Sequence, residues 1–308
     1  MDHVSKGLSE TQKPGIKREF QADRKQIQRR VQLSESLRYV FAGMIFMALL
    51  VLIFLLVDIF RTSRGWLTWD FITGNLSIFP EKAGIFGAIM GTLYMMLIVI
   101  PVTFILGVST AIYLEEYAKQ GRLKHFININ ISNLASVPSV IFGLLGLAVF
   151  SRLLGLGGSI LAGGLTMSLL VLPIVVVASQ EALKAVPSYL REASYALGAD
   201  QWTTVSRVVI PVALPSILTG FILGVSRAIG ETAPLVVLGI PTLILRVPRG
   251  IMDDFTTLPI QIYYWTLDTV LTPEYGNLAA ATIVVLLLVL LVMNSVAIYI
   301  RNRFEKKF

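Results

Sequence analysis

Long apolar stretches separated by polar connectors dominate the sequence. Six of these stretches are close to the ~20 residues with which an α-helix crosses a bilayer. Pro101 predicts a kink in the second stretch, and Pro173 interrupts the fourth. The pattern therefore predicts an all-α membrane protein with six transmembrane helices. The expected crossings are residues 38–60, 85–114, 131–154, 159–179, 215–238 and 278–300.

The connector between the fourth and fifth stretches, residues 180–211, is polar but helix-forming. Pro187 and Ser188 occupy favoured first positions of a helix. Gly198 can take the left-handed conformation that ends a helix, so the first helix is expected to stop at Leu197.

A second helix is expected to follow in the same connector. Asp200 can cap this helix, which is expected to run into Pro211. The two helices would form a hairpin outside the lipid, with a rigid surface that a soluble partner could grip. The alternative is an ordinary amphipathic connector between two membrane helices.

The composition agrees with a membrane protein and limits its chemistry. The 308-residue chain is 55% hydrophobic and 15% charged, with a mean hydropathy of +0.74, which is too apolar for a soluble protein of this size. It has no cysteine, which excludes a disulfide, a thiol nucleophile and a cysteine metal site. Its two histidines, His3 and His125, do not predict a metal site, and no cofactor is expected to bind.

The basic residues lie beside the apolar stretches, as topology signals do. The net charge of +7 therefore does not predict a nucleic-acid partner. With both termini in the cytoplasm, the inner segments hold 19 Lys and Arg and the outer loops hold six, which favours this orientation. Residues 1–37 are then a basic cytoplasmic tail, disordered or partly helical and without a specific ligand, and residues 38–308 are the six-helix domain.

The outer loop, residues 239–277, carries an aromatic run at Tyr263, Tyr264 and Trp265 that suits the membrane interface. We expect a short helix that lies along the outer surface and can contact an extracytoplasmic protein. An aromatic anchor without a partner is an equal alternative.

Two pairs of glycines have the spacing of helix-packing motifs. Gly87 and Gly91 lie in the second stretch, and Gly220 and Gly224 lie in the fifth. Packing within the chain is the favoured use of both pairs.

Two charged residues fall inside the fifth stretch. Ionisable groups at membrane depth are costly and usually face a partner or a water-filled path. Arg227 and Glu231 are four residues apart, so they share a helix face and can pair. Either Arg227 lines a route for an anion, with Glu231 beside it, or the two form a structural ion pair. Thr232, next to Gly230 and Pro234, predicts an irregular helix and a hydroxyl facing a polar cavity.

The hairpin sequence resembles the cytoplasmic coupling loop of ABC importer permeases, EAA-x3-G-x9-I-x-L-P. Here Glu192-Ala193-Ser194 is followed after three residues by Gly198 and, after nine more, by Val208-x-Ile210-Pro211. Ser194 replaces the second alanine of the motif and Ile210 its leucine, and both changes are small. The string from Arg227 to Leu235, RAIGETAPL, is similar to PstA-type permease subunits of bacterial phosphate importers, and the likeness extends over residues 85–303.

This resemblance implies the ABC importer type I fold and a set of partners. These are a second, C-type permease, two ATPase subunits and an extracytoplasmic phosphate-binding protein in a bacterial inner membrane. Arg227 matches an arginine implicated in phosphate passage, and Glu231 and Thr232 would lie beside it in the pathway. The residues expected to couple to an ATPase are Glu192, Ala193, Ser194, Gly198, Ala199 and Asp200.

The sequence has no G-x-x-x-x-G-K-[ST] phosphate loop, so ATP and Mg²⁺ are expected on the partner ATPases and this chain is not expected to be an enzyme. The expected function is the permease subunit of an ATP-driven phosphate importer. A permease for molybdate or sulfate is one alternative. An ATPase-independent channel or secondary transporter and a membrane scaffold are others.

Overall fold

A computed structural model describes residues 15–241, 243–244 and 246–304, without the side chains of residues 15–29, 31–32 and 304. Within these ranges the structure is helical, and its β content is a single isolated bridge between Ser159 and Asp254. The contacts divide the chain into two units, with the boundary after Asp58. The α-helices are α1 (Gly15–Thr62), α2 (Trp69–Thr73), α3 (Phe86–Ile112), α4 (Arg122–Leu134), α5 (Ser139–Gly146), α6 (Ile160–Lys184), α7 (Ser188–Ala196), α8 (Gln201–Thr204), α9 (Ile210–Gly230), α10 (Ala233–Leu238), α11 (Leu258–Asp268) and α12 (Glu274–Phe304).

In the described ranges, three π-helical turns adjoin these α-helices, and one 3₁₀ turn lies in the connector between α2 and α3. The π-turns are η2 (Tyr113–Tyr117), η3 (Leu147–Leu153) and η4 (Val205–Val209), and the 3₁₀ turn is η1 (Pro80–Lys82). The π-turn η2 follows α3 directly, and η4 joins α8 to α9. Such turns often occur at functional positions in helices.

Five helices in the described ranges are long and apolar enough to cross a membrane, and a bent helix pair makes a sixth candidate. The bent pair is α4 with α5–η3, whose axes differ by 101°. The single helix predicted over residues 131–154 is therefore wrong. Pro138 precedes α5 at the break, and a proline both lacks an N–H donor and disfavours a helical conformation in the residue before it.

The fifth predicted crossing, residues 215–238, also differs from the structure. Its helix begins in the hairpin, runs through Pro211 and ends at Gly230. The second hairpin helix reaches Pro211 as predicted, but it continues into the membrane crossing, so the expected start of that crossing at residue 215 is wrong. Pro211 lies in the first turn of α9, directly after η4, where the wider π-turn accommodates a residue without an N–H donor.

In the first unit, α1 passes through residue 37 without a break, so the tail expected over residues 1–37 is helical from Gly15 onward. The part of that tail before Gly15 lies outside the described residues. The predicted domain boundary at residue 37 stays a prediction.

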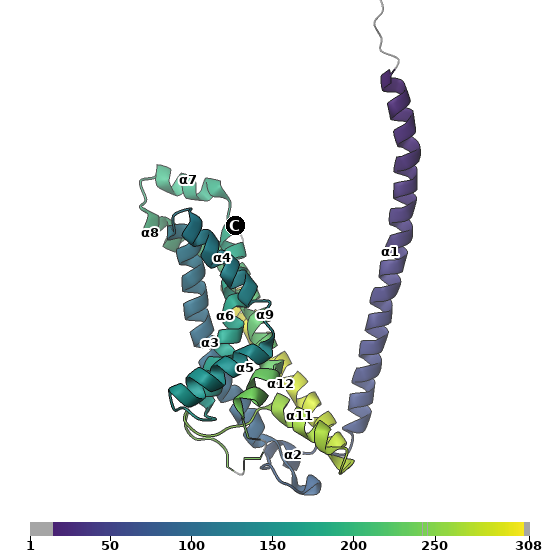
Figure 1. Cartoon of the computed structure of the whole chain (residues 1–308), viewed down its shortest axis with the longest axis vertical. Coiled ribbons are helices and arrows are strands. Elements are labelled where there is room, and N and C mark those ends of the chain that lie inside the picture. The colour runs from purple at the N-terminus through teal and green to yellow at the C-terminus, as the bar shows by residue number, and fades with distance from the viewer. Residues whose placement is uncertain (1–14, 242, 245, 305–308) are drawn as a thin grey trace, which may run out of the picture. The chain divides into compact units, whose positions relative to one another are not determined.

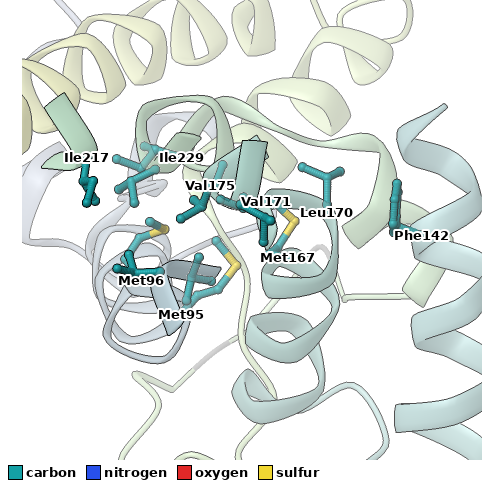
Figure 2. Close-up of a cluster of buried hydrophobic side chains, with 14 of the residues drawn as sticks. Met95, Met96, Phe142, Met167, Leu170, Val171, Val175, Ile217 and Ile229 are labelled. Carbon is teal, nitrogen blue, oxygen red and sulfur yellow. The ribbon is translucent and has the colours of Figure 1, made fainter. Parts of the chain in front are cut away.

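The core of residues 59–308 is built around α6, which packs mainly against α3 and α9 and also contacts α5. Figure 2 shows how side chains from these four helices meet. Three methionines fill the contact between α3 and α6, where an unbranched thioether adapts to irregular gaps. The labelled core residues are Met95, Met96, Phe142, Met167, Leu170, Val171, Val175, Ile217 and Ile229.

Small residues allow close helix contacts in this core. A Cβ at Gly91 of α3 would collide with the Thr256 carbonyl oxygen, and one at Gly220 of α9 would collide with Ala178 of α6. A Cβ at Gly87, by contrast, would meet no atom within 4 Å. The prediction that these glycines serve packing within the chain is confirmed for Gly91 and Gly220.

The short helix expected in the outer loop is present as α11, but Trp265 is not an interface anchor. Trp265 is buried and packs near Phe71 of α2, with ring centroids 6.3 Å apart. Tyr263 is exposed. The prediction of three interfacial aromatic side chains is therefore wrong for Trp265, whose indole helps to hold α11 against α2.

We expect Gly91→Ala to destabilise the protein by about 1–3 kcal/mol, because the added methyl group must push the Thr256 carbonyl away from α3. Gly87→Ala is the matched control, one turn away in the same helix, and should leave stability unchanged or slightly higher. Thermal unfolding of the purified protein in detergent measures both effects. Equal melting temperatures for the two variants would contradict the close contact at Gly91.

Candidate functional site

The connector between α6 and α9 folds as a helical hairpin. Its first helix, α7, has Leu197 at its C-terminal cap, and Gly198 follows with a left-handed φ of +82°. Asp200 caps α8 by accepting a hydrogen bond from the Thr203 N–H at 3.1 Å. The predicted first helix, its stop at Leu197 and the Asp200 cap are confirmed.

The Asp200 carboxylate is favoured in its charged form. Hydrogen bonds from the Thr203 side chain and then from its backbone hold the pKa of Asp200 below the ordinary 3.8. Asp200 is fully exposed, so it stays accessible while it caps the helix.

A buried contact holds the two arms of the hairpin together. The hydroxyl oxygens of Ser194 on α7 and Thr204 on α8 lie 2.9 Å apart, and both residues are buried. Ser194, expected among the residues that couple to an ATPase, therefore faces Thr204 and not the hairpin surface. This hydrogen bond joins α7 to α8.

The outward side of the hairpin combines charge with exposed apolar groups. Glu192, Ala193, Gly198 and Asp200 are exposed, and Ala199 is partly exposed. Large apolar side chains next to them are also exposed, and Leu197 is 89% exposed. Large exposed apolar side chains on a short polar segment are a feature of protein interaction sites. The large exposed side chains are Tyr189, Tyr195, Leu197 and Trp202, which together we call the hairpin patch.

Buried charges lie at the root of the hairpin. Glu115 of η2 is paired with Lys124 of α4 at 3.7 Å and accepts a hydrogen bond from Gln180 of α6 at 3.1 Å. Gln180 also donates to Asn128 at 3.0 Å. The Lys124 side chain is only 7% exposed, and the ion pair offsets part of the cost of burying it.

Arg191 of α7 joins the hairpin to two neighbouring segments. Its guanidinium donates to the Glu116 carboxylate at 2.8 Å, the Leu183 carbonyl at 3.0 Å and the Val186 carbonyl at 2.7 Å. Gln201, the first residue of α8, donates to the Glu116 carbonyl at 2.5 Å. Both arms of the hairpin are thus bonded to Glu116.

Arg227 and Glu231 lie where α9 ends. Gly230 is the last helical residue, and Glu231 is extended, with φ −83° and ψ 127°. The predicted irregularity is confirmed, whereas the expectation of one helix carrying both charges is wrong. Their closest atoms, Arg227 Nε and Glu231 Oε2, are still 4.0 Å apart.

The Arg227 side chain is 53% exposed and that of Glu231 is 19% exposed. Thr232 is partly exposed in the break between α9 and α10. Next to Arg227, Ser226 donates a hydrogen bond to Asn294 of α12 at 2.6 Å. Among the described residues, no three His, Cys, Asp or Glu side chains come together as a metal site would require.

The sequence model of the family described as "Binding-protein-dependent transport system inner membrane component" matches residues 104–307, which include the hairpin and Arg227. The chain belongs to this family. It is a PstA-type ABC importer permease, a membrane subunit that crosses the bilayer several times and belongs to a family without an ATPase site of its own.

Curated relatives of this permease cover most of its length. It is 34% identical to the "Probable ABC transporter permease protein YqgI" of Bacillus subtilis over 84% of this chain and 91% of that protein. It is 37% identical to the "Phosphate transport system permease protein PstA 1" of Mycobacterium tuberculosis over 69% of this chain and 70% of that protein.

A solved structure shares the fold of the permease. The inward-facing MetNI methionine ABC transporter superposes with a TM-score of 0.57 over 70% of this chain and 94% of the matched chain, at 17% sequence identity. At this identity the match supports the type I importer fold alone.

The sequence analysis missed the polar network beneath the hairpin. No role was predicted for Glu115 and Glu116, although both follow a long apolar run directly. Two adjacent acids at the end of such a run are a signal that partners lie nearby. Their partners, Gln180 and Arg191, are 65 and 75 residues away in sequence.

We expect Asp200→Ala to speed hydrogen–deuterium exchange of the α8 amides, because the Thr203 N–H loses its acceptor. Asp200→Asn is the control, since asparagine also caps helices well and should keep exchange near the wild-type rate. The folded pKa is lowered, so the contribution of the charged cap is complete above the ordinary value of 3.8 and is lost as the pH falls through the folded pKa. Equal exchange in the alanine and asparagine variants at neutral pH would contradict the cap.

Proposed function

We propose that this permease is the PstA-type subunit of an ATP-driven phosphate importer. The observation that carries the proposal is the exposed hairpin, a rigid pair of helices whose outward side offers Glu192 and the hairpin patch to a partner. The likeness to proteins named as phosphate transport permeases supports phosphate as the substrate.

The hairpin is proposed to dock into one of two ATPase subunits in the cytoplasm. Glu192, Ala193, Gly198, Ala199 and Asp200 would lie in or next to the contact. Ser194 would act from beneath by holding the arms together. The excess of Lys and Arg on the same side of the membrane as the hairpin supports cytoplasmic termini and a cytoplasmic hairpin.

The pathway is proposed to pass Arg227 and to be completed by a second, C-type permease. A guanidinium with more than half of its surface exposed keeps its donors available, and its planar fork suits a tetrahedral oxyanion. Glu231, 4.0 Å away, limits how strongly an anion is held, which lets the anion leave again. The Thr232 hydroxyl offers a neutral partner beside them.

Transport would follow alternating access. An extracytoplasmic phosphate-binding protein delivers phosphate, and the partner ATPases, which hold ATP and Mg²⁺, close around the nucleotide and pull on the hairpins. The helices then move between inward-open and outward-open states. The permease itself carries out no hydrolysis.

A permease for another oxyanion such as molybdate or sulfate is the second candidate. The observation in its favour is that a guanidinium beside a carboxylate does not distinguish one tetrahedral oxyanion from another. Uptake of radiolabelled phosphate in the presence of each competitor separates the two candidates.

We expect Arg227→Ala to lower phosphate uptake by about 10- to 100-fold, because the anion loses its charged donor. Arg227→Lys keeps the charge without the planar fork and should fall between the alanine variant and the wild type. Uptake is measured with radiolabelled phosphate in cells that lack the native permease, and co-purification with the ATPase should be unchanged. Normal uptake by Arg227→Ala would remove this residue from the pathway.

We expect Glu192→Lys to weaken ATPase association at least about fivefold, because a reversed charge would face the partner at the centre of the hairpin. Glu181→Lys is the matched control: it reverses an exposed carboxylate on α6, outside the hairpin. Association is measured by co-purification of the ATPase with the tagged permease. Equal recovery from both variants would count against docking at the hairpin.

A further inference from the structure

The end of α3 is bonded to both arms of the hairpin through one residue. The Glu116 carboxylate accepts from Arg191 of α7 at 2.8 Å, and the Glu116 carbonyl accepts from Gln201 of α8 at 2.5 Å. The Glu116 side chain is only 8% exposed and that of Arg191 is 22% exposed, so this pair is more strongly coupled than a surface ion pair.

The two acidic residues of η2 have different partners. Glu115 and Glu116 are adjacent in η2, yet their carboxylates bind different groups. Glu115 is held by Lys124 and Gln180, which belong to the helices packed around it. The Glu116 carboxylate, by contrast, binds Arg191 of the hairpin.

Arg191 cannot move away from Glu116 without losing other bonds. The same guanidinium donates to the Leu183 carbonyl at the end of α6 and to the Val186 carbonyl just beyond it. Carbonyls at a helix C-terminus attract cations and need donors. One side chain therefore fastens α7 to α6 and η2 together. The hydrogen-bonded pair Glu116 and Arg191, with the carbonyls that Arg191 also binds, is called the clamp here.

The helix α3 extends from the clamp to the opposite end of residues 59–308. In Figure 1, α7 and α8 lie at one end of this unit, and α2 and α11 lie at the other. Near its first turns, α3 is bonded to the start of α11, because the Leu258 N–H donates to Thr92 Oγ1 at 3.0 Å. Gly91 lies against the Thr256 carbonyl beside it.

We propose that Glu116 and Arg191 are positioning residues that join the hairpin to α3, so that the hairpin and α3 move as one body in the transport cycle. This deepens the proposed function and rests on it. The hairpin is joined to α6 and α9 by the chain itself. The clamp adds a third connection, through which displacement of the hairpin reaches Thr92 and the segment before α11.

The first test compares Glu116→Gln, Arg191→Gln and the double variant in proteoliposomes that contain the complete transporter. The measured quantity is labelled phosphate taken up per ADP released. Each single variant should lower this ratio by roughly tenfold while the ATPase still co-purifies and hydrolyses ATP. The double variant should lose no more than the worse single variant, because the residues act as a pair.

Glu181→Gln is the matched control. It removes a carboxylate that is exposed and bonded to Lys184 on α6, and it should leave the ratio unchanged. An unchanged ratio in Glu116→Gln overturns the clamp. Loss of ATPase co-purification in Glu116→Gln also overturns it, since the pair would then support the docking surface and not the connection to α3.

The second test replaces the ion pair by a covalent link. The chain has no cysteine, so Glu116→Cys with Arg191→Cys creates the only two thiols, which a short bifunctional thiol reagent can join. The double substitution should lower the amount of phosphate taken up per ADP released, and linking the two thiols should restore this ratio. If linking stops transport, the hairpin must separate from α3 during the cycle and the proposal is wrong.

Failure of the proposed function has a different signature. In that case the wild-type permease itself recovers no ATPase, or takes up no phosphate when ATP is supplied. These outcomes are read from the unmodified protein, before any variant is compared.

Discussion

The two ends of α6 must find partners for backbone groups that the helix itself cannot satisfy, and the rest of the structure depends on how they do so. At the N-terminal end, Ile160 and Leu161 donate to the carbonyls of Asp253 and Ile251, and Ala162 donates to Ser159 Oγ. At the C-terminal end, Arg191 supplies donors to two carbonyls. The central helix is therefore fixed at one end by the loop before α11 and at the other by the hairpin.

Between these ends, α6 can be central only because small side chains let its neighbours approach. Gly164 of α6 lies against Ile98, and Gly107 of α3 lies against Val175. The methionines between α3 and α6 fill the space that remains. Closely packed helices are expected to move together, because a dense core is hardly compressible and transmits strain. A hairpin bonded to α3 and continuous with α6 is thus attached to the densest part of the protein.

Local sequence signals predicted the elements that depend on local contacts. The left-handed Gly198 and the Asp200 cap follow from residue types within a few positions of each other, and the structure confirms both. The helix ends near Arg227 were only half predicted. The pattern indicated an irregular segment at Gly230–Pro234 but could not show that α9 would stop at Gly230. The hairpin and the crossing from residue 215 were predicted as separate elements, whereas the helix continues through Pro211 after the π-turn.

Contacts between residues far apart in the sequence could not be predicted from local patterns. Trp265 reads as an interfacial anchor until Phe71, from another helix, is placed against it. Glu116 has no visible role until Arg191 and Gln201 are brought to it. Both cases depend on tertiary packing, which sets the partners of a side chain independently of its own sequence neighbours.

The bend after α4 shortens the straight part of the third predicted crossing. The straight segment Ser139–Leu153 has 15 residues and reaches at most about 22 Å, less than the ~30 Å hydrophobic thickness of a bilayer. It packs against α10, another short helix, with Gly143 touching Pro234. A bilayer accommodates a helix shorter than its hydrocarbon by local thinning or by water at the helix ends. On the proposed pathway past Arg227, an anion would therefore cross less hydrocarbon beside the break that carries Glu231 than beside a full-length helix.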